Sequence, residues 1–307
     1  MSRVAAIDCG TNSIRLLIAD ISDGNFREII REMEIVRLGQ GVDATGQFDP
    51  EAVERTLNAT RKYADLIRSK GVEKIRFCAT SATRDASNRE IFIDGVKEIL
   101  GIEPEVIPGS EEAALSFIGA TKELKHADAP YLVVDIGGGS TEFVLGSDEV
   151  KYAKSMNIGC VRMAERHLKV SPPKPLDVQN AIADIDKAIF EASHIVPLTE
   201  AKTLIAVAGT ATTVAAAALN LDQYDRYAIH LSRIPTEKVL EVAQRFSLMK
   251  RDELAALPYM HPGRVDVITA GAIVLSRVMV ATGASEFVAS ESDILDGMAW
   301  SLSQSTN

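Results

Sequence analysis

One short pattern occurs twice in this chain and constrains its fold more than any other feature. Residues 8–13 read DCGTNS and residues 135–140 read DIGGGS, and the two strings align without gaps. Each follows a short apolar run, at Val4–Ile7 or Tyr131–Val134, and each precedes a second extended run. A strand, turn and strand unit that recurs once in each half indicates two related domains.

Predicted strands alternate with predicted helices along the rest of the chain, which is typical of an α/β fold. One helix is predicted to begin at Asp49, with Pro50 in its first turn, and to end at Gly71. Asn88 is predicted to cap a second helix. A polar stretch at 125–130 predicts a boundary between a domain at 1–126 and a domain at 127–307, with the last helix free to pack back on the first domain. A chain of 307 residues has room for both.

The two turns have the chemistry of phosphate-binding loops. Glycine lets backbone amides approach an anion closely, and serine or threonine hydroxyls add donors. A single glycine-rich turn could equally be a plain hairpin, but two matching turns in two matching halves favour a phosphate clamp. The residues predicted to cradle phosphate are Gly10, Thr11, Asn12, Ser13, Gly137, Gly138, Gly139, Ser140 and Thr141.

Each turn also carries acidic residues, which beside phosphate are best explained by Mg²⁺ or another divalent cation between them. Asp135 and Glu142 are candidate metal ligands or water-orienting groups, because they could project from the tight turn toward one pocket. Asp8 is the candidate in the first half. The alternatives are an exposed strand carboxylate for Glu142 and bonding to its own turn amides for Asp8.

Composition narrows the possible partners. A net charge of −10 argues against a general nucleic-acid or membrane binder, so a polyanion would have to be bound by a local patch. The three cysteines are far apart, which argues against a disulfide framework or a zinc site. The sequence shows no signal peptide, and its most apolar stretch, at 203–219, is broken at Gly209. We therefore expect a cytoplasmic protein.

The repeated motif resembles the two phosphate loops of the actin-like ATPase superfold. Residues 208–212 (AGTAT) resemble its nucleotide-side glycine loop, which adds Gly209 and Thr210 to the phosphate-binding set. Three strings resemble the exopolyphosphatase and guanosine pentaphosphate phosphohydrolase family: 79–88 (ATSATRDASN), 107–113 (IPGSEEA) and 135–142 (DIGGGSTE). The likeness covers essentially the whole chain and implies a short form with two actin-like (ribonuclease H-like) α/β domains and a cleft between them.

The resemblance assigns roles to further residues. It places the catalytic general base at Glu112 rather than Glu111, although either could merely stabilise a helix N-terminus. It implies that Arg84 binds phosphate through its forked guanidinium, where the alternative is a salt bridge. It also implies that Arg264 reaches a distal phosphate and that Asp266 holds it, unless both merely open a helix. Asp296 stands where an arginine is expected, which weakens any role for the last helix.

The resemblance implies an exopolyphosphatase that releases terminal phosphate from inorganic polyphosphate by attack of water, with Mg²⁺. The nearest alternative is the same reaction on guanosine pentaphosphate. An actin-like small-molecule kinase and a nucleotide-gated switch without enzymatic activity are the other classes. A homodimer is also implied, with no nucleic-acid or membrane partner.

Overall fold

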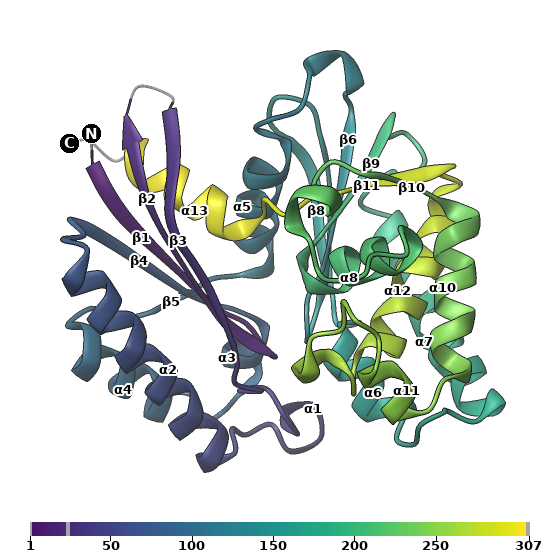
Figure 1. Cartoon of the computed structure of the whole chain (residues 1–307), viewed down its shortest axis with the longest axis horizontal. Coiled ribbons are helices and arrows are strands. Elements are labelled where there is room, and N and C mark those ends of the chain that lie inside the picture. The colour runs from purple at the N-terminus through teal and green to yellow at the C-terminus, as the bar shows by residue number, and fades with distance from the viewer. Residues whose placement is uncertain (1, 23–24, 305–307) are drawn as a thin grey trace. The chain divides into compact units, whose positions relative to one another are not determined.

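The computed structural model describes residues 2–22 and 25–304, which form two compact units with one sheet each (Figure 1). Unit 1 spans Met1–Gly119 together with Ile294–Asn307, and unit 2 spans Ala120–Asp293. The units thus divide at Gly119 rather than at residue 126, and the last helix belongs to unit 1.

Unit 1 contains a five-stranded sheet in the order β3-β2-β1-β4-β5. Its strands are β1 (Ser2–Cys9), β2 (Ser13–Ser22), β3 (Asn25–Ile35), β4 (Lys74–Ala79) and β5 (Glu105–Val106). The first three are antiparallel neighbours, whereas β4 runs parallel to β1 and β5 parallel to β4. The carboxyl ends of β1, β4 and β5 therefore lie at one edge of the sheet.

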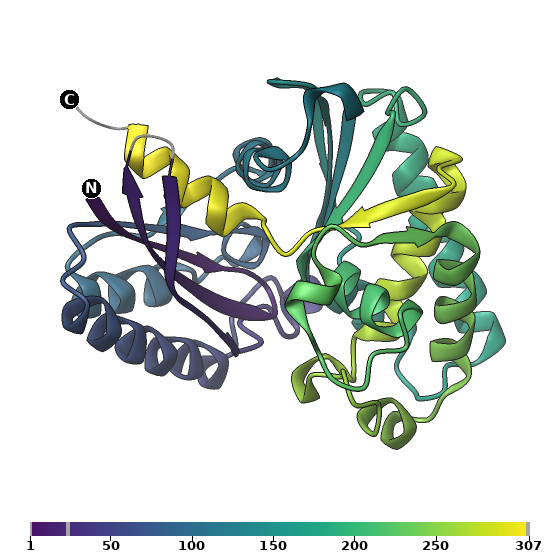
Figure 2. The ribbon, with the colours of Figure 1, turned by 45° about the horizontal axis from the view of Figure 1, so that its top comes forward.

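Helices cover both faces of this sheet. They are α1 (Val42–Thr45), α2 (Pro50–Ser69), α3 (Ser81–Asp85), α4 (Glu90–Leu100), α5 (Gly109–Thr121) and α13 (Ile294–Gln304). α2 and α4 lie on one face and α13 crosses the other (Figures 1 and 2). Ala5 and Ile7 of β1 pack with the α2 side, and Val4 and Ala6 pack with α13. Because both faces are covered, the strand reads as a continuous apolar run.

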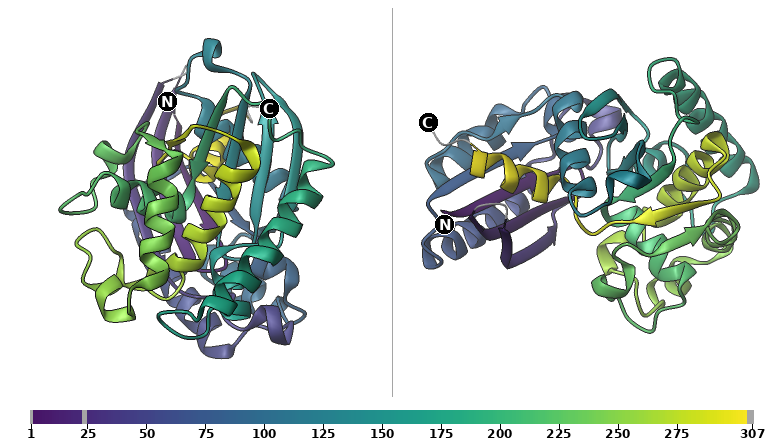
Figure 3. Two further views of the ribbon diagram at one scale, coloured as in Figure 1. Left: turned by 90° about the vertical axis from the view of Figure 1, so that its right-hand side faces the viewer. Right: turned by 90° about the horizontal axis from the view of Figure 1, so that it is seen from above.

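Unit 2 contains a six-stranded sheet in the order β10-β11-β9-β6-β7-β8. Its strands are β6 (Tyr131–Ile136), β7 (Thr141–Gly146), β8 (Val150–Met156), β9 (Thr203–Val207), β10 (Arg233–Pro235) and β11 (Glu286–Ala289). Its helices are α6 (Cys160–His167), α7 (Pro175–Ser193), α8 (Ala208–Ala218), α9 (Arg226–Ile229), α10 (Thr236–Leu248), α11 (Arg251–Ala255) and α12 (Ile268–Thr282). α12 packs beside α10 and also contacts α6, α7 and α8 (Figure 3).

The two sheets repeat one topology. The strand order is β3-β2-β1-β4-β5 in unit 1 and β8-β7-β6-β9-β11 in unit 2, where β10 is added beyond β11. In both sheets the first strand of the unit therefore lies between the second and the fourth. β9 runs parallel to β6, and β11 parallel to β9. The α/β class and the duplicated strand, loop and strand core predicted from the sequence are therefore confirmed.

Of the two helix caps predicted from the sequence, one is confirmed and one is wrong. The Asp49 carboxylate accepts hydrogen bonds from the amides of Glu51 and Ala52, as predicted for the start of α2. The prediction for Asn88 was wrong, because Arg89 precedes α4 as its N-cap. The Asn88 side chain instead accepts from the Phe48 amide at 2.7 Å and donates to the Phe48 carbonyl at 3.1 Å. This pairing uses both its donor and its acceptor, whereas a cap would use one.

A cluster of ion pairs lies near the C-terminal end of β2. Asp20 is 3% exposed and accepts hydrogen bonds from Arg3 and Arg27, each at 2.7 Å. The hydrogen bond from Arg3, and then that from Arg27, hold the pKa of Asp20 well below its usual range.

Within the described residues, no helix combines the length and apolarity needed to cross a membrane.

Candidate active site

The two predicted phosphate loops close with the same hydrogen bond. The Gly10 amide donates to the Ser13 carbonyl at 3.0 Å, and the Gly137 amide donates to the Ser140 carbonyl at 3.0 Å. A Cβ on Gly137 would lie 3.2 Å from the Ser140 carbonyl oxygen, so the turn leaves little room for a side chain. The sequence repeat is thus also a repeat of backbone geometry.

The loop of unit 1 is held by the segment that follows β3. The Thr11 carbonyl accepts from the Gly39 amide at 2.9 Å, and a Cβ on Gly39 would lie 2.3 Å from Thr11 Cγ2. The trans peptide points the Asn12 amide the other way, away from Gly39. Within residues 2–22 and 25–304, the buried Thr11 hydroxyl has no hydrogen-bond partner. An unsatisfied buried donor at this turn fits a site made for an anion.

Asp8 faces an arginine across the hairpin. Asp8 and Arg15 are directly opposite in β1 and β2, and Arg15 donates to the Asp8 carboxylate from Nη2 at 2.7 Å and from Nε at 3.0 Å. The Arg15 charge makes the Asp8 carboxylate a weaker attractor for a second cation.

The carboxyl ends of β4 and β5 bring together two further predicted residues. Arg84 lies in α3 after β4, and Glu112 lies in the first turn of α5 after β5. Arg84 Nη1 donates to the Glu112 carboxylate at 2.7 Å and to the Ile107 carbonyl at 2.8 Å. Glu112 is 9% exposed. The neighbouring Glu111 side chain is 42% exposed and pairs with Arg76.

The second hairpin places two carboxylates where the first has an ion pair. Asp135 and Glu142 are directly opposite in β6 and β7, so their side chains lie on the same face of the sheet. Both are buried, at 6% and 1% exposure. Ser155 Oγ donates to Glu142 at 2.6 Å. Two buried, adjacent carboxylates are a donor set that fits a divalent cation.

Two predicted residues, Gly209 and Thr210, lie in the first turn of α8 after β9, where the sequence predicted a loop, and Arg264 packs on Gly209. A Cβ on Gly209 would lie 2.4 Å from Arg264 Nη2, so the guanidinium lies directly on the Gly209 backbone. Arg264 Nη1 donates to Thr213 Oγ1 at 2.9 Å. Thr210 is buried against Gly271, where a Cβ would lie 2.6 Å from its hydroxyl oxygen. Asp266, predicted to hold Arg264, accepts from Arg251 Nε at 2.7 Å.

The sequence interpretation missed Gly39, Gly159 and Arg162, which all touch the loops. A Cβ on Gly159 would lie 2.3 Å from the Gly138 carbonyl, and Arg162 Nε donates to the Gly139 carbonyl at 2.7 Å. One signal could have found Arg162: a basic residue in the first turn of a helix opposes the helix dipole, so it needs another reason to be there.

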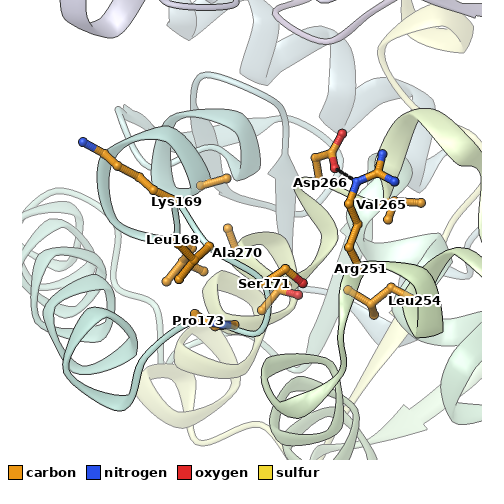
Figure 4. Close-up of a pocket in the computed structure, with 12 residues that line it drawn as sticks. Leu168, Lys169, Ser171, Pro173, Arg251, Leu254, Val265, Asp266 and Ala270 are labelled. Carbon is orange, nitrogen blue, oxygen red and sulfur yellow. Dashed lines mark hydrogen bonds and ion pairs between the residues drawn. The ribbon is translucent and has the colours of Figure 1, made fainter.

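A separate pocket of about 220 Å³ lies between the end of α6, α11 and the start of α12 (Figure 4). Leu168, Val265 and Ala270 line it, together with the Arg251–Asp266 ion pair, and the Lys169 side chain extends away from that pair. It contains none of the residues predicted to bind phosphate, and we assign it no role.

Each unit therefore presents a glycine loop, a buried acidic residue and an arginine at the carboxyl ends of its parallel strands, which is where open α/β sheets bind ligands. These features fit a two-unit α/β protein whose ligand carries phosphate groups. The comparison with known families is more specific. The chain belongs to the Ppx/GppA phosphatase family, whose profile matches residues 17–305.

The similar proteins agree with this assignment. The chain is 49% identical to Exopolyphosphatase 2 of Mycobacterium tuberculosis, over 98% of this chain and 99% of that protein. The structure resembles the crystal structure of an exopolyphosphatase from Cytophaga hutchinsonii with a TM-score of 0.90 and 26% identity, covering 100% of this chain and 99% of that one. It is also 35% identical to the guanosine-5'-triphosphate,3'-diphosphate pyrophosphatase of Vibrio atlanticus, over 58% of this chain and 36% of that protein.

Proposed function

We propose that this protein is an exopolyphosphatase that releases terminal phosphate from inorganic polyphosphate by attack of water. One observation carries the choice of hydrolysis: Glu112 is buried and fixed by Arg84, whereas Glu111 is half exposed and pairs elsewhere. A general base must be held in one orientation to activate water. The relative named exopolyphosphatase that matches over its full length supports polyphosphate as the substrate.

Glu112 orients a water molecule and takes its proton as the water attacks the terminal phosphorus in line with the leaving oxygen. Arg84 keeps Glu112 in place and offers its other guanidinium N–H groups to a phosphate oxygen. Backbone amides of a glycine loop stabilise charge on the phosphoryl oxygens, and the candidate loops are 10–13 in unit 1 and 137–140 in unit 2. The leaving group is the shortened polyphosphate chain.

Asp135 and Glu142 would hold Mg²⁺, which supplies charge neutralisation on the phosphoryl oxygens when it is bound. Within the described parts of the chain, no group of three or more His, Cys, Asp or Glu side chains could hold a metal. A site with only two carboxylates suits Mg²⁺, which usually keeps several waters and binds substrate phosphates as well. The Arg15 ion pair makes Asp8 the weaker candidate ligand.

Guanosine pentaphosphate is the second candidate substrate, because the pyrophosphatase of Vibrio atlanticus is also similar to this chain. That likeness covers 58% of the chain, whereas the exopolyphosphatase relative covers 98%, which favours polyphosphate. The homodimer and the cytoplasmic location predicted above stay predictions. Light scattering of the purified chain would test the first.

Released phosphate from tripolyphosphate, long-chain polyphosphate, guanosine pentaphosphate and ATP, each with Mg²⁺ and with a chelator, tests the proposal. We expect the highest kcat/KM on a polyphosphate and loss of turnover in the chelator. A preference for guanosine pentaphosphate would move the protein to the second candidate. Transfer of phosphate from ATP to an acceptor without net hydrolysis would make it a kinase, and no release from any compound would reject enzymatic hydrolysis.

A further inference from the structure

The first residues of α6 donate hydrogen bonds to the glycine loop at 137–140. The amide of Cys160 donates to the Gly137 carbonyl at 2.9 Å, and those of Val161 and Arg162 donate to the Gly138 carbonyl at 2.9 and 3.1 Å. The first amides of a helix have no partner within it, and here the loop carbonyls satisfy them. No side chain caps α6. The helix and the loop thus form one backbone arrangement.

This arrangement decides where the loop amides point. In a trans peptide the C=O and the following N–H point in opposite directions. Because the carbonyls of Gly137 and Gly138 point at α6, the amides of Gly138 and Gly139 point away from it, toward the open side of the turn. Gly159 makes the close contact possible, since a Cβ there would lie 2.3 Å from the Gly138 carbonyl oxygen.

The third peptide of the loop, between Gly139 and Ser140, has a different support. Its carbonyl accepts from Arg162 Nε at 2.7 Å and from the Gly159 amide at the longer distance of 3.2 Å. Arg162 is only 8% exposed. It also stands in the first turn of α6, where a positive side chain opposes the helix dipole. A buried arginine in an unfavourable position is expected to have a specific task, because burying a charge is costly.

Resting on the proposed function, we propose that Arg162 is a positioning residue for the reaction: it holds the Gly139 carbonyl so that the Ser140 amide donates to the bound phosphate. Arg162 acts through the backbone and does not touch the substrate. Without it, the Gly139–Ser140 peptide can rotate, and one donor to the phosphoryl group is misaligned.

Arg162→Ala is compared with Arg166→Ala, a matched control on the same helix. The Arg166 side chain is 35% exposed and pairs with Asp184 of α7. We expect kcat/KM on polyphosphate to fall by about 10- to 100-fold for Arg162→Ala, since a misplaced group near the chemistry costs about that much, and to stay near wild type for the control. Added guanidinium ion should restore part of the activity to Arg162→Ala only, compared with sodium chloride at equal ionic strength.

A binding measurement separates this inference from the proposed function. Inorganic phosphate is titrated into protein labelled with ¹⁵N at glycine and serine, without metal or turnover, and the Ser140 amide resonance is followed. We expect a phosphate-dependent shift in wild type that is reduced in Arg162→Ala and kept in Arg166→Ala. If wild type hydrolyses none of the compounds but this pattern holds, the proposed function fails and the role of Arg162 stands.

Two results would overturn the role of Arg162. One is a folded Arg162→Ala protein with kcat/KM within about threefold of wild type and the same Ser140 shift. The other is a wild-type Ser140 amide that does not respond to phosphate. If Arg162→Ala does not fold, Arg162→Lys replaces it, with Arg166→Lys as control: the lysine keeps the charge but loses the fork. For Arg162→Lys, the phosphate-dependent shift of the Ser140 amide is then expected to be smaller than in wild type but not zero. A shift equal to that of wild type would again overturn the proposal.

Discussion

Replacing Glu142 with glutamine should make the metal-free protein more stable and remove its response to Mg²⁺. Glu142 and Asp135 are cross-strand neighbours in β6 and β7, and both are buried. Two buried carboxylates this close disfavour ionisation of both, and a cation bound between them removes that cost. Glutamine keeps the shape of the side chain and can still accept the hydrogen bond from Ser155.

The size of the effect follows from the geometry. Directly opposite residues have Cβ atoms about 5 Å apart. Two unit charges at that distance, at an effective dielectric constant of about 20, repel by about 3 kcal/mol. This is an upper limit for the stabilisation of Glu142→Gln in a chelator. For a domain of this size it corresponds to a rise in Tm of at most about 10 °C.

The assay is thermal unfolding of wild type and variant, in a chelator and in Mg²⁺. For wild type we expect Mg²⁺ to raise the free energy of unfolding, by about 2.7 kcal/mol at 100 times Kd. For Glu142→Gln we expect a higher Tm than wild type in the chelator and almost no change with Mg²⁺. Glu149→Gln is the control, because Glu149 is an exposed glutamate in the turn between β7 and β8.

Either of two results would refute this reasoning. If Glu142→Gln is less stable than wild type in the chelator, repulsion between the two carboxylates is not the dominant effect at this site. If Mg²⁺ raises the Tm of both proteins equally, the cation binds elsewhere, and the assigned roles of Asp135 and Glu142 are wrong.

Three further predictions concern other residues. Glu112→Gln should lower kcat by about 100-fold or more, whereas Glu111→Gln, measured in the same phosphate-release assay, should stay within a few-fold of wild type; equal losses would contradict the assignment. Asp20→Asn should lower the Tm at pH 7 by about 5 °C. Arginine pairing lowers the pKa of Asp20 in the folded state, so the stability that this pairing gives to wild type is present above the ordinary pKa of 3.8 and is lost as the pH falls through the folded pKa. The Tm values of wild type and Asp20→Asn should therefore converge in acid. A difference in Tm that does not change with pH would argue against pairing. Gly159→Ala should reduce kcat/KM by about 100-fold, because the added Cβ displaces the loop at 137–140. The control is Gly71→Ala, at a positive φ of 64° with no atom within 4 Å of the added Cβ, which should lower stability but not activity. Equal losses of activity in both variants would mean that destabilisation alone explains them.

The features that could be predicted from the sequence are those made by residues close together in the chain. The two turns close between positions three residues apart, and the cap at Asp49 bonds amides two and three residues on. A tight hairpin also fixes its own register, and this register places Asp135 opposite Glu142. For these features, local backbone geometry and hydrogen bonding settle the structure.

Features that join distant segments could not be predicted in this way. Arg162 lies 23 residues beyond the carbonyl it holds, and Arg84 and Glu112 are 28 residues apart. Asn88 is a residue type that commonly caps helices, yet its side chain bonds to Phe48, which lies 40 residues away. The sequence left the last helix free to pack back on the first domain, and in the structure it joins unit 1 because Ile294, Leu295 and Met298 bury apolar surface against β1 and β2. That choice depends on the apolar area removed from water once the sheet has formed, and the helix sequence alone does not contain it.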